Sequence, residues 1–139
     1  MAVIIRTYRK TDRVMVIDLW KKVFNNPDFH NDPALAIDMK TKNNDDLFFV
    51  AADDSLIVGT VLAGFDGHRG WIYSLAVRSD HRKRGIGSDL MKRALSELKD
   101  LGCLKVNLQV EGDNADVVSF YETVGFIVED RISMGIRLY

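Results

Sequence analysis

A buried strand, a basic loop with two glycines and an amphipathic helix follow one another directly between residues 71 and 101. Residues 71–77 are almost all apolar, aromatic or β-branched, which predicts a buried strand. Apolar residues then recur at helical spacing from Leu90 to Leu101, and Gly102 predicts the end of this helix. Between the two elements, Gly85 and Gly87 allow a tight turn whose backbone can closely approach a ligand.

This junction of strand, loop and helix predicts a phosphate-binding site. The free N–H groups of a helix's first turn, together with the helix dipole, favour an anion. Arg82, Lys83 and Arg84 add positive charge there. The alternative is a structural turn beside a solvated basic face, but the complete context favours a phosphate. Two nucleotide-binding motifs are excluded, because G-x-x-x-x-G-K-[ST] is absent and Leu90 occupies the third glycine position of G-x-G-x-x-G.

Two blocks of the sequence match known motifs. Residues 82–87 read R-K-R-G-I-G and match [RQ]-x-x-G-x-[GA], which resembles the signature of the GNAT family of N-acetyltransferases. Asn114 and residues 120–126, which read F-Y-E-T-V-G-F, are similar to the family's N…[FL]-Y-E-x-x-G-F element. The blocks occur in the family's order and at its usual separation, so the specific resemblance covers residues 71–126.

The length and the hydrophobic pattern predict a single α/β (α+β) domain over residues 1–139. The expected order is one strand, two helices, three strands, one helix, one strand, one helix and two final strands near 126–128 and 132–138. The resemblance implies the same order, with about four helices and a mixed central sheet. It also implies that the strands ending at Val77 and Val110 splay apart.

The resemblance further implies that acetyl-coenzyme A is the acyl donor and that no metal is needed. Its pantetheine arm would pair with the strand that ends at Val77, and its pyrophosphate would lie on the glycine loop. The expected donor-binding residues are Leu75, Ala76, Val77, Arg82, Lys83, Arg84, Gly85, Ile86, Gly87, Ser88 and Asn114. Asn114 has a second interpretation as the cap of the helix that begins at Ala115.

Tyr121 is the candidate general acid. A phenol has an unperturbed pKa of ~10, so at neutral pH it holds a proton that it can give to a departing thiolate. The resemblance places this position beside the thioester sulfur. The alternative interpretation is a tyrosine that packs against Phe120 and Phe126.

The general base stays open. Many members of the family carry a glutamate on the strand before the asparagine element, but this chain has Gln109 there, which cannot act as a base. Glu111, Asp66, His68 and a chain of water molecules are the alternatives.

We therefore expect an N-acetyltransferase that moves the acetyl group of acetyl-coenzyme A to a primary amine by direct attack in a ternary complex. The acceptor is a small molecule, a peptide or a protein. The alternative function is a non-catalytic sensor or interaction module that binds coenzyme A or acyl-coenzyme A, which the missing strand glutamate keeps open. The resemblance also allows a homodimer.

Composition and charge bear on partners and location. The formal net charge of −1 argues against nucleic-acid and membrane partners. Cys103 is the single cysteine, which rules out an internal disulfide and fits a cytoplasmic location. We expect neither a signal peptide nor a membrane-spanning segment.

Overall fold

The computed structural model of this chain describes residues 2–25, 27–112 and 114–139. These residues form two compact units, Met1–Leu108 and Gln109–Tyr139. The expected single domain over residues 1–139 stays a prediction, and Met1, Asn26 and Asp113 lie outside the described residues.

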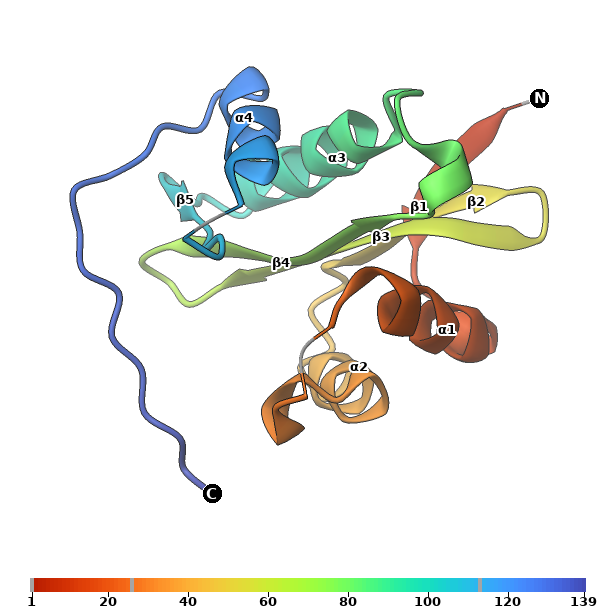
Figure 1. Cartoon of the computed structure of the whole chain (residues 1–139), viewed down its shortest axis with the longest axis horizontal. Coiled ribbons are helices and arrows are strands. Elements are labelled where there is room, and N and C mark those ends of the chain that lie inside the picture. Colours follow the sequence, from red (N-terminus) through yellow and green to blue (C-terminus); the bar gives the residue numbers. More distant parts are fainter. Residues whose placement is uncertain (1, 26, 113) are drawn as a thin grey trace. The chain divides into compact units, whose positions relative to one another are not determined.

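A five-stranded mixed sheet forms the centre of the first unit (Figure 1), which confirms the predicted fold class. Its strands, in spatial and sequence order, are β1 (Val3–Thr7), β2 (Phe48–Asp53), β3 (Leu56–Phe65), β4 (Gly70–Val77) and β5 (Val106–Asn107). The first four strands pair antiparallel, whereas β5 runs parallel to β4 and pairs with Gly70 and Trp71 alone. The remainder of β4 therefore has no β5 partner among the described residues.

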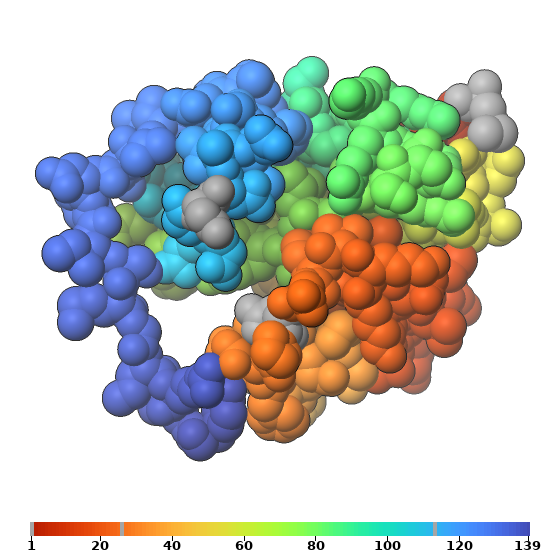
Figure 2. Space-filling model, in the orientation of Figure 1, coloured from red at the N-terminus to blue at the C-terminus, as the bar shows by residue number. Residues whose placement is uncertain are grey.

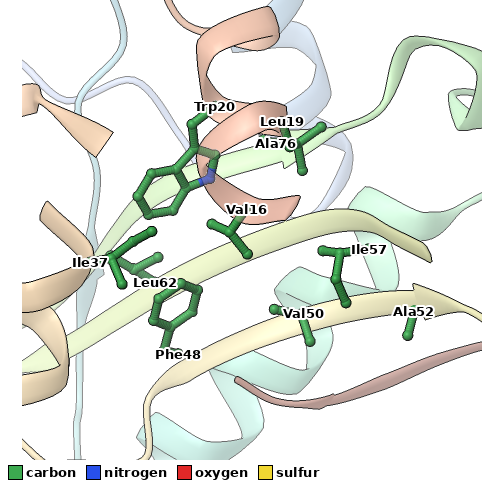
Figure 3. Close-up of a cluster of buried hydrophobic side chains, with 10 residues drawn as sticks. All are labelled: Val16, Leu19, Trp20, Ile37, Phe48, Val50, Ala52, Ile57, Leu62 and Ala76. Atoms are coloured by element: carbon green, nitrogen blue, oxygen red, sulfur yellow. The ribbon is translucent and has the colours of Figure 1, made fainter. Parts of the chain in front are cut away.

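Helices cover both faces of this sheet. They are α1 (Arg13–Val23), α2 (Pro33–Lys42) and α3 (Ile86–Asp100). Figure 1 shows α1 and α2 on one face and α3 on the other. The α1 side buries a hydrophobic cluster from both helices and three strands (Figure 3), whose members are Val16, Leu19, Trp20, Ile37, Phe48, Val50, Ala52, Ile57, Leu62 and Ala76. Such burial is the main force that holds helices on a sheet.

The beginnings of α1 and α2 show how local sequence fixes these helices. Asp32 accepts a hydrogen bond from the Leu35 N–H at 3.1 Å, and Pro33 is in the first turn, as the sequence predicts. At α1 the sequence allows Thr11 or Asp12 as the cap, but no side-chain cap forms. The Asp12 carboxylate instead accepts hydrogen bonds from the Arg9 N–H and the Arg6 guanidinium, so it joins β1 to the helix start.

The second unit contains one helix, α4 (Ala115–Thr123). The prediction of two strands near 126–128 and 132–138 is wrong, because residues 124–139 contain no strand. Alternating apolar residues favour a strand, yet a strand forms only where a partner takes up its backbone N–H and C=O groups. No such pairing is present here, and the side chains of Ile132, Met134, Ile136 and Leu138 are exposed.

Candidate functional site

The loop after β4 leads into an uncapped helix N-terminus. A short turn, η3 (Ser79–His81), is followed by a loop in which Lys83 and Gly85 adopt φ angles of 63° and 80°. The value at Gly85 lies in the left-handed region that favours glycine. Gly85 precedes α3, and no side chain caps this end. The first N–H groups of α3 therefore have no intrahelical partner and are available to an anion.

Three exposed cations surround this helix end. Arg82, Lys83 and Arg84 are all exposed, and the green segment that contains them lies at the surface in Figure 2. Arg82 Nε also donates a hydrogen bond to the Val77 carbonyl at 3.3 Å, which joins the loop to the end of β4. Free N–H groups beside fixed positive charge suit the diphosphate that the sequence predicts.

His81 connects the loop to the sheet, and the sequence analysis did not identify it as a site residue. Its side chain is buried, with Nε2 2.9 Å from Asp53 Oδ2 and Nδ1 2.7 Å from Asp80 Oδ1. The hydrogen bond to Asp53 and then that to Asp80 raise the pKa of His81 above its ordinary value. Asp53 is 28 residues away in the chain, so no local pattern could have revealed this contact.

The strand expected to bind pantetheine contains a β-bulge. Thr60 is opposite Ala76 and Leu62 is opposite Tyr73, so β4 has one residue more than β3 over this stretch. Ser74, within the bulge, has a φ of 51°. All the predicted donor-binding residues except Asn114 lie on one continuous segment, residues 75–88, from the bulge into α3.

In the second unit, Tyr121 lies on α4 among aromatic rings. It makes edge-on contacts with Phe120 and Phe126, with ring centroids 5.3 and 5.8 Å away. Burial raises the pKa of Tyr121 to about 12, so the hydroxyl is protonated at neutral pH. The contacts of the packing alternative are therefore present, and the role as general acid stays a prediction.

Asn114 caps α4. Its side-chain oxygen accepts a hydrogen bond from the Val117 N–H at 3.4 Å, as the capping interpretation predicts. Its contact with the donor stays a prediction.

The candidates for the general base differ in their surroundings. Asp66 Oδ1 accepts hydrogen bonds from the N–H groups of Arg69 and His68, each at 2.8 Å. These bonds lower the pKa of Asp66, which makes it a weaker base and gives it a role in the β3–β4 turn. Glu111 is exposed, and the Gln109 amide donates to the Ser133 hydroxyl. The general base therefore stays unassigned.

Membrane-spanning helices and metal-binding clusters are both absent from the residues that the structure describes. None of the helices is long and apolar enough to cross a membrane. No three side chains among His, Cys, Asp and Glu come together where they could hold a metal ion.

Known proteins resemble this chain in sequence and in fold. The model of the acetyltransferase (GNAT) family matches residues 13–126. An acetyltransferase of Sodalis glossinidius is 40% identical over 136 residues, which cover 96% of this chain and 94% of that protein. The crystal structure of Ard1 from Thermoplasma volcanium superposes with a TM-score of 0.81 at 25% identity, covering 93% and 85% of the two chains. AAC(6')-Iy in complex with the bisubstrate analogue CoA-S-monomethyl-acetylneamine has a TM-score of 0.79 at 19% identity and covers 99% of each chain.

Proposed function

Because the chain belongs to the acetyltransferase (GNAT) family, we propose that it is an N-acetyltransferase that uses acetyl-coenzyme A and a primary amine. The observation that carries this proposal is the uncapped start of α3, where Gly85 has a positive φ and three cations are adjacent. We also propose that residues 1–139 form one catalytic domain.

The donor is bound by backbone groups of the first unit. The N–H groups of Arg84, Gly85, Gly87 and Ser88 bind the pyrophosphate, and the exposed side chains of the loop add charge. The backbone of Leu75, Ala76 and Val77 pairs with the pantetheine arm. β5 pairs with β4 only as far as Trp71, so residues 75–77 have no β5 partner among the described residues. This gap in the pairing supports the assignment.

Direct transfer forms a carbon–nitrogen bond and breaks the carbon–sulfur bond of the thioester. The amine loses a proton, and the departing thiolate benefits from one. Tyr121 supplies that proton or donates a hydrogen bond to the sulfur. Its pKa of about 12 lies above the ~8.5 of a free thiol, so the hydroxyl keeps its proton at neutral pH until the thiolate departs.

The acceptor carries a primary amine. Support comes from AAC(6')-Iy, whose structure holds an analogue that joins coenzyme A to an acetylated aminoglycoside fragment. Within the amine class we propose a small molecule, a peptide or a protein as the acceptor.

A screen of amines tests this function. The protein is incubated with acetyl-coenzyme A and a library of small amines, peptides and proteins, and the released thiol is measured. We expect turnover with one acceptor class and an N-acetylated product in mass spectrometry. Coenzyme A binding without turnover on any amine would contradict catalysis and favour the sensor.

A further inference from the structure

Two consecutive hydrogen bonds link α1 to the bulge of β4. Trp20 Nε1 donates to Thr60 Oγ1 at 2.8 Å, and Thr60 Oγ1 donates to the Ser74 carbonyl at 2.9 Å. The indole N–H can only donate, so the Thr60 oxygen accepts from Trp20 and its single proton is directed to Ser74. Trp20 and Thr60 are both buried and Ser74 is half-buried, so the bond between the two buried side chains is shielded from water.

The last acceptor in this chain is a strained residue. Ser74 has a φ of 51°, and non-glycine residues keep such a conformation only when their surroundings hold it. The pairing of β3 with β4 offers little support here, since the register passes from the Thr60–Ala76 pair directly to the Leu62–Tyr73 pair. The Thr60 hydroxyl is therefore the contact that fixes the direction of the Ser74 carbonyl.

The direction of this carbonyl also fixes the next N–H group. The C=O and N–H of a planar trans peptide point in opposite directions, and no cis peptide is present among the described residues. Thr60 lies on the α1 side of the sheet, where it meets Trp20. Its bond to Ser74 therefore turns the Leu75 N–H away from Thr60.

The Trp20 indole, which donates the first of these hydrogen bonds, is also fixed in place. Trp20 packs in the core cluster (Figure 3) and stacks on the Phe48 ring, with centroids 5.9 Å apart. Phe48 in turn stacks on Tyr8 at 4.2 Å. The hydrophobic core thus holds the indole ring in place, and the indole N–H fixes the orientation of the Thr60 hydroxyl.

We propose that Trp20 and Thr60 are positioning residues that hold the Ser74–Leu75 peptide in the orientation that binds the acyl donor. This inference rests on the proposed function, because residues 75–77 are the stretch that we assign to the pantetheine arm. Loss of the Thr60 hydroxyl releases the Ser74 carbonyl, and the peptide can then rotate. The rotation removes the Leu75 N–H from the face that the donor meets.

The test replaces Thr60 in the full-length chain. Thr60→Val keeps the shape of the side chain but removes the hydroxyl, whereas Thr60→Ser keeps it. We expect Thr60→Val to weaken coenzyme A binding in calorimetry by roughly tenfold, the scale of one lost hydrogen bond. Thr60→Ser should bind like the wild type. In the ligand-free protein, the NMR amide signal of Leu75 should shift in Thr60→Val and stay in place in Thr60→Ser.

A core variant separates positioning from stability. Val16→Ala removes buried apolar atoms from the same face of the sheet but leaves the hydrogen-bond chain intact, so it should lower Tm and preserve donor affinity. Equal affinity in folded Thr60→Val and wild type would overturn the positioning role alone, as would an affinity loss in Val16→Ala matching that in Thr60→Val. A wild-type protein that binds no coenzyme A would overturn the proposed function. It would also overturn the proposed role of Trp20 and Thr60 in binding the acyl donor.

Discussion

The two units hold their candidate functional groups by different means. In residues 1–108, hydrogen bonds from other strands hold the segment from the β4 bulge to α3: Thr60 of β3 donates to the Ser74 carbonyl, and Asp53 of β2 contacts His81. In residues 109–139, α4 has no fully buried residue, and Tyr121 is held mainly by two neighbouring rings. The proposed donor-binding segment is thus held by the sheet and its core, whereas the candidate proton donor belongs to a helix without a fully buried residue. We therefore expect variants in the two units to separate binding from turnover.

The largest effect is expected from Gly87→Val in the first unit. Gly87 lies in the first turn of α3, where a branched side chain would stand between the backbone and the pyrophosphate. Coenzyme A binding in calorimetry should be abolished while circular dichroism shows a folded protein.

A matched glycine outside the loop controls for this substitution. Gly64 lies in β3, and a Cβ atom added there meets no atom within 4 Å. Gly64→Val should therefore bind coenzyme A like the wild type. Unchanged affinity in folded Gly87→Val would remove the phosphate site from this loop.

Tyr121→Phe tests the second unit and carries the next largest effect. The change keeps the ring but removes the hydroxyl proton. If Tyr121 is the general acid, turnover at saturating donor should fall roughly 10²–10⁴-fold with little change in coenzyme A affinity. The packing alternative predicts nearly normal turnover and at most a modest change in Tm.

A second variant separates the hydroxyl from the ring packing. Phe126→Leu removes one of the rings beside Tyr121 but leaves the hydroxyl in place. It should lower Tm more than Tyr121→Phe and preserve turnover better. The opposite ranking, with chemistry shown to be rate-limiting, would assign Tyr121 to packing.

Sequence patterns predicted those parts of the molecule that depend on neighbouring residues. The strand at 71–77 and the helix that ends before Gly102 follow from local periodicity and a glycine stop, and the structure confirms both as β4 and α3. The Trp20–Thr60 hydrogen bond spans 40 residues, and no local pattern reveals such a contact. The prediction of a strand at 132–138 is wrong for a related reason. The alternation of apolar residues is a property of one segment, whereas a strand also needs a second segment with which to pair.

The smallest effect concerns pH and contrasts His81 with Tyr121. Both ring nitrogens of His81 face carboxylate oxygens, so both bonds can form only when the ring is protonated. Asp53 and Asp80 raise the pKa of His81, and Arg84 opposes them. Tyr121, with a pKa of about 12, keeps its proton throughout the neutral range. A change of pH through the raised pKa of His81 should therefore affect the first unit and leave Tyr121 protonated.

Because the folded-state pKa of His81 is raised, protonation of His81 stabilises the fold below the unfolded value of ~6.5, and this contribution is lost as pH rises through the folded pKa. The glutamine of His81→Gln cannot titrate. The variant's free energy of unfolding should therefore fall furthest below that of the wild type at about pH 5.5 and less far below it at about pH 9. Between these two pH values, the difference in unfolding free energy between variant and wild type should change by on the order of 1 kcal/mol, the scale of one hydrogen bond, as measured by urea unfolding. The control is Tyr121→Phe, because the Tyr121 hydroxyl keeps its proton over this range and the stability difference of that variant from the wild type should stay constant with pH. A His81→Gln deficit that stays constant with pH would mean that His81 holds the loop by packing alone. The charge of His81 would then have no part in holding this loop on the sheet.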